Sequence, residues 1–256
     1  RTKKHVLING ETINWQSPVE KGDKISLTFD TEDYPDKTIL MGEASLVEPL
    51  YEDQHLIVVN KPEGMKTHGN DPTEIALLNH VSAYCDQTCY VVHRLDMETS
   101  GAVLFAKNPF ILPILNRLLE DKLIQRQYWA LAEGRFQTKE TVYKDKIGRD
   151  RHDRRKRVVD PRKGQRAYTT ITRLKTFNGT SLVNCQLKTG RTHQIRVHLA
   201  HHGHAILGDP LYSRQHASRL MLHAHSLSFT HPLTLEKITV QARSESFEQG
   251  LRNHKP

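Results

Sequence analysis

Cysteine is scarce in this sequence. The 256 residues contain only three, Cys85, Cys89 and Cys185. Three cysteines cannot form a fully paired disulfide framework, so we expect free thiols and a reducing, cytoplasmic location. Cys85 and Cys89 lie about one helical turn apart, but a metal ion would need two further ligands. We therefore interpret both as small buried apolar residues.

Long apolar segments and export signals are also missing. No run approaches the roughly 18 consecutive apolar residues of a membrane-spanning helix, so we expect no membrane partner. The first ten residues, RTKKHVLING, lack the basic end, apolar stretch and cleavage site of a signal peptide. The chain begins at Arg1 without an initiator Met, so we expect it to be part of a longer protein.

Several common catalytic motifs are absent. The sequence contains no GxxxxGK[ST], which would bind nucleotide phosphates, and no GxSxG, which marks a common hydrolase nucleophile. Sixteen histidines could suggest a metal centre, but there is no HExxH. His198 and His202 lie four apart without a carboxylate between them. We therefore interpret the histidines as surface or structural residues and expect no metal site.

Positive charge is abundant and unevenly distributed. The chain has 37 Lys and Arg against 29 Asp and Glu, a net charge of +8. Residues 144–166 hold 11 of these basic residues and only four Asp, so most of the excess lies in one segment. Such a segment can bind a polyanion, most commonly a nucleic acid. The alternative is a solvated loop without a ligand.

The apolar pattern predicts an α+β domain. At 256 residues the chain suits one large domain, or a domain with a small appendage. Asn178-Gly179 between two partly alternating runs is a strong hairpin signal. Strands outnumber helices and no βαβ rhythm occurs, which favours a mixed, mainly antiparallel sheet. The expected helices are 72–84, 110–121 and 192–203; the expected strands are 6–8, 25–29, 55–62, 101–107, 128–135, 167–177, 180–190, 219–232 and 235–242.

Five polar loops follow strands or precede helices, and active sites are often built from such loops. In HRLDMETSG, a polar cluster interrupts an apolar run and offers two carboxylates, Asp96 and Glu98. Taken singly, each loop could be only a turn: Asp96 could cap a helix, and Arg191 could be a surface cation. The loops are NKPEGMKTH (60–68), HRLDMETSG (93–101), KTGRTHQIRVH (188–198), LGDPLY (207–212) and LMLHAHSLSFTHP (220–232).

Taken together, the motifs closely resemble those of the RluA-type (RluA- and RluD-like) RNA pseudouridine synthases. The resemblance runs in order from about residue 48 to 242 and includes YWALAEG at 128–134. It implies an α+β pseudouridine synthase fold: a mixed, mainly antiparallel sheet with flanking helices and loops, and an active-site cleft across the sheet.

The resemblance also implies a domain organisation. Residues 1–30 are similar to the second half of a small RNA-binding module of the kind found in ribosomal protein S4, and we expect its helical first half to be missing from this chain. Residues 31–47 would be a linker, and 48–256 the catalytic domain. Oligomeric state is not readable from motifs, and we expect a monomer.

The same resemblance implies a reaction and a nucleophile. Enzymes of this family isomerise a uridine within RNA: the bond between ribose and nitrogen breaks, and a bond to carbon 5 of the base forms. Asp96 would be the nucleophile and Glu98 a neighbour. An adjacent guanidinium would keep the carboxylate ionised, and by resemblance this is Arg191. Tyr128 would stack on the uracil and is the candidate for removing the proton from carbon 5.

Other residues receive roles by resemblance or by charge. Arg94 would fill the space of the flipped base, because the enzyme must extrude its target nucleotide. The isomerisation involves no redox step, so no cofactor is expected. The expected partner is ribosomal or transfer RNA. The candidate substrate-binding residues are Arg94, His93, Ile195, Leu222 and Thr99; the candidate RNA contacts are Lys61, Arg154, Arg155, Lys156 and Arg157.

Two other function classes fit parts of the pattern. An RNA-binding protein with a vestigial synthase fold would explain the basic segment, but it has no use for Asp96, Tyr128 and Arg191 together. A metal-dependent RNA hydrolase would need a ligand cluster with carboxylates, which the sequence does not offer. We therefore expect an RNA pseudouridine synthase.

Overall fold

The computed structural model describes residues 5–12, 14, 16–29, 34 and 39–253. The chain forms two compact units that divide between residues 38 and 39. In the first unit, β1 (Val6–Ile8) pairs antiparallel with both β2 (Glu11–Thr12) and β3 (Ile25–Leu27). Asn9 and Gly10 both have positive φ, 53° and 86°, so they form the tight turn that the sequence predicts.

Residues 39–47 of the linker expected at 31–47 belong to the second compact unit. Residues 31–33 and 35–38 lie outside the described part of the chain, whereas residues from 39 onward belong to the second unit. There the backbone N–H of Gly42 donates to the Asn79 carbonyl at 3.0 Å. A short 3₁₀ turn, η2 (Ala44–Leu46), contacts the helix that carries Asn79. This segment is therefore packed rather than free.

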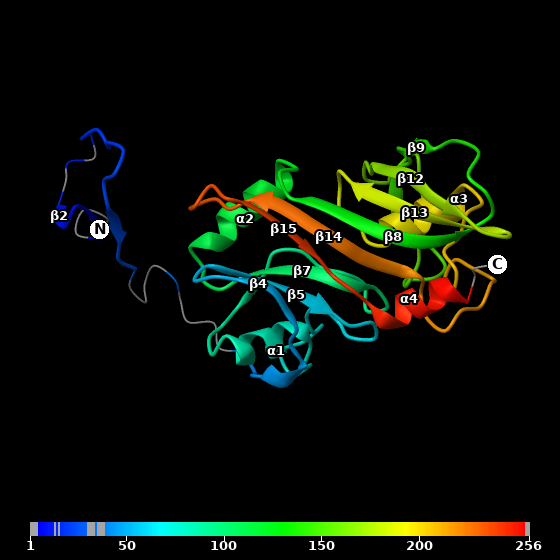
Figure 1. Ribbon diagram of the computed structural model, residues 1–256, viewed down its shortest axis with the longest axis horizontal. Helices are drawn as coiled ribbons and strands as arrows, with labels where there is room; N and C mark the ends of the chain where they lie inside the picture. Colours follow the sequence, from blue (N-terminus) through cyan, green and yellow to red (C-terminus); the bar gives the residue numbers. More distant parts are fainter. Residues whose placement is uncertain (1–4, 13, 15, 30–33, 35–38, 254–256) are drawn as a thin grey trace. The chain divides into compact units, whose positions relative to one another are not determined.

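A ten-stranded mixed sheet forms the second unit (Figure 1). Among its described strand pairs, only β7 and β14 run parallel, and the others are antiparallel, as expected. The strands lie in the order β4 (Pro49–Glu52), β5 (Leu56–Lys61), β7 (Ser100–Ala106), β14 (Leu222–Thr230), β8 (Gln125–Glu133), β13 (Thr180–Leu187), β12 (Thr169–Thr176) and β9 (Glu140–Tyr143), with β15 (Lys237–Gln241) beside β14 and β6 (Tyr90–Val91) beside β7.

The centre of the sheet is buried on both faces. Along β5, Ile57 and Val59 belong to one apolar cluster, and Leu56 and Val58 to the other. This alternation is what a strand requires when both of its faces are covered. The first face is covered by α1 (Leu77–Tyr84), α3 (Gln194–His201) and α4 (Glu245–Arg252), and the second by α2 (Ile111–Glu120).

Gly101 permits the parallel contact between β7 and β14. It is paired with Ala224 and has a φ of +117°. A Cβ atom at this position would lie 2.2 Å from the carbonyl oxygen of Ala224, well inside van der Waals contact. Only glycine lets the two backbones approach so closely.

Three elements differ from the sequence-based expectation. The helix expected from residue 72 begins at Leu77, because the Asp71 carboxylate accepts hydrogen bonds from Thr73 and holds residues 71–73 in a turn. Helix α4 was not predicted. The basic segment, for which a free loop was an alternative, contains the hairpin of β10 (Ile147–Arg149) and β11 (Arg157–Val159). No helix in the described part of the chain is long and apolar enough to cross a membrane.

Candidate active site

A cavity of about 580 Å³ brings together most of the predicted site residues. Its size suits a ligand of about one nucleotide. Four parts of the chain line it: the loop between β6 and β7, the segment from the end of α2 into β8, the loop that leads from β13 into α3, and Leu222 on β14. The lining includes Asp96, Tyr128, Arg191, His93, Arg94, Thr99, Ile195 and Leu222.

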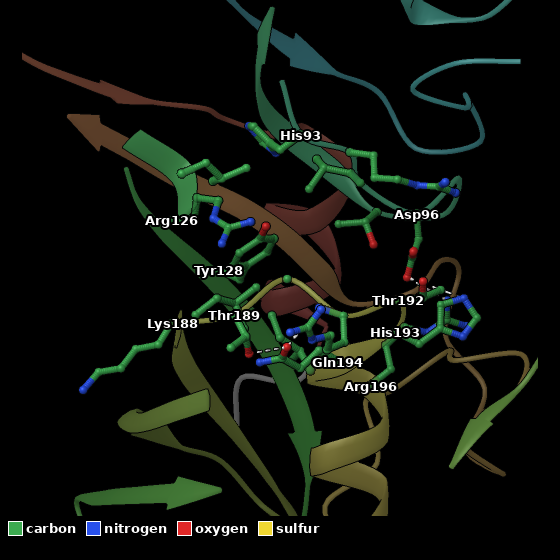
Figure 2. Close-up of a pocket in the computed structure, with 18 of the residues that line it drawn as sticks. His93, Asp96, Arg126, Tyr128, Lys188, Thr189, Thr192, His193, Gln194 and Arg196 are labelled. Carbon is green, nitrogen blue, oxygen red and sulfur yellow. Dashed lines mark hydrogen bonds and ion pairs between the residues drawn. The ribbon is translucent and has the colours of Figure 1, made fainter. Parts of the chain in front are cut away.

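Asp96 is held in a braced loop at the cavity wall (Figure 2). Immediately before it, the Thr67 hydroxyl accepts a hydrogen bond from the Leu95 N–H and donates one to the Leu95 carbonyl, both at 3.0 Å. The Asp96 carbonyl accepts from the Thr99 N–H at 3.1 Å. The Asp96 side chain keeps 19% of its surface exposed. The loop therefore presents a carboxylate that remains accessible from the cavity.

The cation paired with Asp96 is Arg196, so the prediction of Arg191 in this role was wrong. Nη1 of Arg196 donates to Oδ2 of Asp96 at 3.2 Å and lies 3.7 Å from Glu98. Arg191 lines the cavity but is exposed, and its Nε donates to the carbonyl of Arg166. Arg196 lies in α3, where residues 194–199 are all buried, whereas Arg191 lies in the exposed loop before the helix.

Arg196 is itself held by a second carboxylate. Its Nε and Nη2 donate to the two oxygens of Asp209, each at 2.8 Å. Both side chains are essentially buried, with 1% and 0% of their surfaces exposed. Burial opposes the charge on Arg196, but the bonded Asp209 outweighs it and raises the pKa of the guanidinium, with a smaller contribution from Asp96. Asp209 belongs to LGDPLY, so two of the predicted loops meet behind Asp96.

Lys61 is not the surface RNA contact that we predicted. It is fully buried, and its amine donates to the carbonyls of Pro62, Met65 and Met97. Burial lowers the pKa of Lys61 to about 8, against the opposing charges of nearby carboxylates, with Asp96 the largest of these. Met97 directly follows Asp96. Lys61 therefore supports the loop that carries Asp96 from behind, through the backbone of that loop.

Tyr128 faces the cavity from β8, on the other side from Asp96 (Figure 2). It is 5% exposed, and burial raises the pKa of its phenol, while the charge of Arg126 acts in the opposite direction. Ile195 and Leu222 line the same cavity and are each 4% exposed. An aromatic ring and two aliphatic side chains thus form apolar walls that suit a flat base.

The remaining predicted substrate-binding residues also line the cavity. Arg94 is exposed and Thr99 is buried. His93 is buried, and its Nε2 accepts a hydrogen bond from the Leu104 N–H at 3.1 Å, which places the proton of the neutral ring on Nδ1. Burial, with a contribution from Arg126, lowers the pKa of His93 to about 3. His93 is therefore an uncharged part of the cavity wall.

Two site residues were missed by sequence reasoning, His193 and Tyr212. His193 has a positive φ of 56° just before α3, and its Nε2 lies 3.8 Å from Oδ2 of Asp96. Its Nδ1 lies 2.9 Å from the Tyr212 hydroxyl, which accepts a hydrogen bond from the Arg157 N–H at 2.7 Å. Both residues lie in quoted motifs, but only the fold shows that they connect β11 to Asp96.

The basic residues proposed for RNA contact lie outside the cavity lining. Arg154 and Arg155 are exposed, and Lys156 and Arg157 are half-buried. Arg155 is paired with Asp153 at 2.9 Å. Strand β11 packs against α3, with Val159 beside the small apolar cluster of Ile147, Ala167 and Val197. The hairpin is therefore an ordered basic projection that is anchored to the helix carrying Arg196.

Within the described parts of the chain, one group of side chains could hold a metal ion. Donor atoms of Asp145, His201 and His202 lie within 4.8 Å of one another at the end of α3. Nε2 of His202 is 2.8 Å from the Asp145 carboxylate, and its ring stacks on Tyr143 at 3.9 Å. None of the three lines the cavity. The same geometry arises when a histidine hydrogen-bonds an aspartate simply to join two parts of the fold, here the end of α3 and the segment 143–145.

Comparison with known proteins identifies the family. Residues 55–201 match the RNA pseudouridylate synthase family, and residues 1–25 match the N-terminal domain of the RluD ribosomal pseudouridine synthase. The chain is 38% identical to the uncharacterised RNA pseudouridine synthase YhcT of Bacillus subtilis over 93% of its own length and 80% of the relative's. It is 33% identical to the ribosomal large subunit pseudouridine synthase D of Neisseria meningitidis serogroup A, over 93% and 68% of the two chains.

Solved structures agree with this assignment. The human RNA pseudouridylate synthase domain containing 1 aligns with a TM-score of 0.67 and 25% identity, over 79% of this chain and 85% of that one. The human RNA pseudouridylate synthase domain containing 4 aligns equally well, over 80% and 92%. The chain belongs to the RluA family of RNA pseudouridine synthases and is an isomerase that acts on uridine in RNA.

Proposed function

We propose that this enzyme uses Asp96 as its nucleophile and acts on ribosomal RNA. The observation that carries the proposal is the setting of the Asp96 carboxylate. It lines a cavity of nucleotide size, is bonded by the buried Arg196, and shares that cavity with Tyr128. A nearby guanidinium favours the ionised form of a carboxylate, and only that form can attack carbon.

Asp96 would hold one fragment of the uridine while the base turns. The bond from ribose C1′ to N1 breaks and a bond from C1′ to C5 forms; C5 loses a proton and N1 gains one from solvent, so the isomerisation consumes no electrons and no net atoms. A carboxylate bonded to the ribose or to the base would keep the two fragments together between these steps. The apolar walls of Ile195 and Leu222 would let the uracil rotate without strong directional contacts.

Tyr128 is the candidate acceptor of the proton that leaves C5. Burial raises the pKa of its phenol, which makes the phenolate scarce but strongly basic. Arg94, exposed at the cavity, would enter the RNA stack and occupy the space of the extruded base. Both roles follow from a reaction that must take the base out of a folded RNA before it can reach C5.

Large-subunit ribosomal RNA is the substrate class that the relatives favour. The similar synthase D is named as a ribosomal large subunit enzyme, and the N-terminal match is to the N-terminal domain of the ribosomal enzyme RluD. Transfer RNA is the second RNA to be tested. The three free cysteines fit a cytoplasmic enzyme that works where these RNAs are made.

The test is tritium release from RNA whose uridines are labelled at C5. Ribosomal and transfer RNA are incubated separately with the wild type, Asp96→Asn and Glu98→Gln. We expect release from ribosomal RNA by the wild type and by Glu98→Gln, and at least a 10³-fold loss in Asp96→Asn with RNA binding retained, because the amide cannot act as a nucleophile.

Glu98→Gln is the matched control, because it neutralises a carboxylate two positions away that also lies near Arg196. Turnover by Asp96→Asn at the wild-type rate would remove Asp96 from the mechanism. Release from transfer RNA alone would show that transfer RNA is the substrate, and it would not contradict the proposed reaction.

A further inference from the structure

Arg126 differs from the other buried cations of the second unit. The four buried Lys and Arg side chains are Lys61, Arg126, Arg196 and Arg219. Lys61 donates to three carbonyls, Arg196 to two carboxylates, and Arg219 to Glu63 and to serine hydroxyls. Arg126 is only 9% exposed, yet its guanidinium makes no hydrogen bond or ion pair within the described residues, and its buried Nε has no partner.

An unpaired guanidinium is expensive to bury. Removal from water costs several kcal/mol per ion unless an opposite charge or hydrogen-bond acceptors replace the lost hydration. Arginine keeps its charge under all physiological conditions, so it cannot escape this penalty by losing a proton. A buried arginine that is left open on a cavity is therefore suited to a ligand that supplies the missing acceptors.

The guanidinium of Arg126 is open to the cavity. Arg126 and Tyr128 are two residues apart on β8, so both point to the same face of the sheet, and both line the cavity (Figure 2). The loop residue Gly190 lies directly against it: a Cβ atom there would be 3.2 Å from Nη1 of Arg126. The absence of a side chain at Gly190 leaves the planar donor edge uncovered.

The surrounding charges indicate an anion. Lys188 and Arg191 flank Gly190, and Lys122 ends the turn between α2 and β8, four residues before Arg126. All of them line the cavity, and Glu120 is the one acid that lines it in this neighbourhood. In Figure 2 the Lys188 side chain extends away from Arg126 and Tyr128, so the balance rests on Arg126, Arg191 and Lys122 against Glu120, and it favours an oxyanion over a neutral carbonyl.

We propose that Arg126 is the centre of a phosphate-binding subsite that takes a phosphate group of the nucleotide whose base enters the cavity. The subsite rests on the proposed function, because that function places a uridine beside Tyr128. Arginine binds phosphate through two parallel N–H···O bonds, a geometry that also fixes orientation. The phosphate would be fixed on the Arg126 side of Tyr128, and the nucleophile would act from the Asp96 side.

Thermal unfolding of the intact chain tests the subsite without requiring turnover. The proteins are the wild type, Arg126→Met, Arg126→Lys and the control Arg243→Met, whose side chain is 83% exposed. Each is measured alone, with uridine, and with uridine 5′-monophosphate at the same concentration. Without ligand, Arg126→Met should melt higher than the wild type by about 2–4 °C, because an apolar side chain relieves the unpaired charge.

The ligand arms give a second, independent result. Uridine 5′-monophosphate should raise the melting temperature of the wild type, Arg126→Lys and Arg243→Met more than uridine does, and this difference should vanish in Arg126→Met. A lower melting temperature for ligand-free Arg126→Met would mean that Arg126 supports the fold, and would overturn the proposal.

Three further outcomes would also overturn it. In the first, uridine 5′-monophosphate leaves the melting temperature of the wild type unchanged. In the second, it raises the melting temperatures of the wild type and Arg126→Met equally. In the third, uridine and uridine 5′-monophosphate raise the melting temperature of the wild type equally. If both ligands raised the melting temperature of the wild type equally and neither raised that of Arg126→Met, Arg126 would bind a carbonyl of the base rather than a phosphate. If no tritium were released but the expected changes in melting temperature were observed, the proposed nucleophile and substrate would be contradicted and the phosphate subsite would stand.

Discussion

Two arginines of the segment TGRTHQIR have opposite surroundings. Arg191 is exposed and bonds a backbone carbonyl, whereas Arg196 is buried between Asp96 and Asp209. The buried Arg196 has two roles, because it neutralises Asp209 and orients Asp96, the proposed nucleophile. Nothing in the order of the letters distinguishes the two, since either could reach a carboxylate in a neighbouring loop.

Substitution of the two arginines should separate these tasks. Arg196→Gln leaves Asp209 as a buried, unpaired charge, so we expect the free energy of unfolding to fall by about 3–5 kcal/mol and turnover to be lost. Arg191→Gln changes an exposed side chain, and its stability should stay within about 0.5 kcal/mol of the wild type. Urea unfolding and tritium release measure both. Equal destabilisation by the two variants would contradict the assignment of the ion pair.

Because burial lowers the pKa of Lys61, the stability of the fold should depend on pH. The pKa of Lys61 is about 8 in the folded chain, against an ordinary value of 10.5. Between these values the unfolded chain binds a proton that the folded chain has released, so stability rises with pH. The wild type should therefore gain about 2 kcal/mol relative to Lys61→Met between about pH 7.5 and 9.5. Urea unfolding at the two pH values measures this gain.

The exposed Lys237 provides the control for this measurement. The difference between the wild type and Lys237→Met should stay constant over the same pH range. A constant difference for Lys61→Met as well would show that Lys61 keeps its proton throughout, stabilised by the carbonyls of Pro62, Met65 and Met97.

Much of the residue-level site could be predicted from the sequence. Asp96, Tyr128, Ile195 and Leu222 do converge on one cavity, as the resemblance implied. Lys61 was misplaced because its motif position carries no information on burial. Solvation and pairing depend on neighbours that are distant in the chain, which is why the partners of Arg196 and the isolation of Arg126 appear only in three dimensions.

At the scale of elements, the hairpin β10–β11 places basic residues of the segment 144–166 on an ordered element. Its arginines project from a short antiparallel pair that packs on α3, and its Arg157 N–H bonds the Tyr212 hydroxyl next to His193. RNA that binds the hairpin would therefore meet an element with a direct connection to the nucleophile loop.

Neutralisation of the hairpin should flatten the salt dependence of RNA binding. Replacement of Arg154, Arg155, Lys156 and Arg157 by Gln should weaken binding and reduce the slope of log affinity against log salt by about 2–3, because each lost phosphate contact releases fewer counterions. The measurement is a filter-binding titration with ribosomal RNA at several salt concentrations.

The control carries the same number of neutralised charges elsewhere. Arg117, Lys237, Arg243 and Arg252 are all exposed and distant in sequence from the hairpin. If this quadruple variant lost as much of the slope as the hairpin variant, the effect would be one of net charge, and the hairpin would have no special role.

Local signals predicted elements well, and elements without local signals were missed. The Asn178-Gly179 turn joins β12 and β13 as expected, because two residues determine its geometry. Helix α4 was missed because its segment contains Gly250, which weakens helix propensity. The structure explains this glycine: a Cβ atom there would lie 2.7 Å from the side chain of Met221.

At the scale of the whole second unit, the single parallel pair β7–β14 joins two antiparallel halves of the sheet. Asp96 belongs to the half that contains β5 and β7. Tyr128 and Arg196 come from the half that contains β8 and β13. Strand patterns predict that the strands exist, but not this junction, because pairing between distant segments leaves no periodic trace in the sequence.

The junction has a kinetic consequence for the newly made chain. Asp96 and Arg196 are 100 residues apart in sequence, and contacts of such separation form late, after the entropy of a long loop has been lost. Asp96 therefore acquires its counterion only when the two halves of the sheet have docked. A partly folded chain can already expose its basic segment, but it has no assembled centre with which to modify RNA.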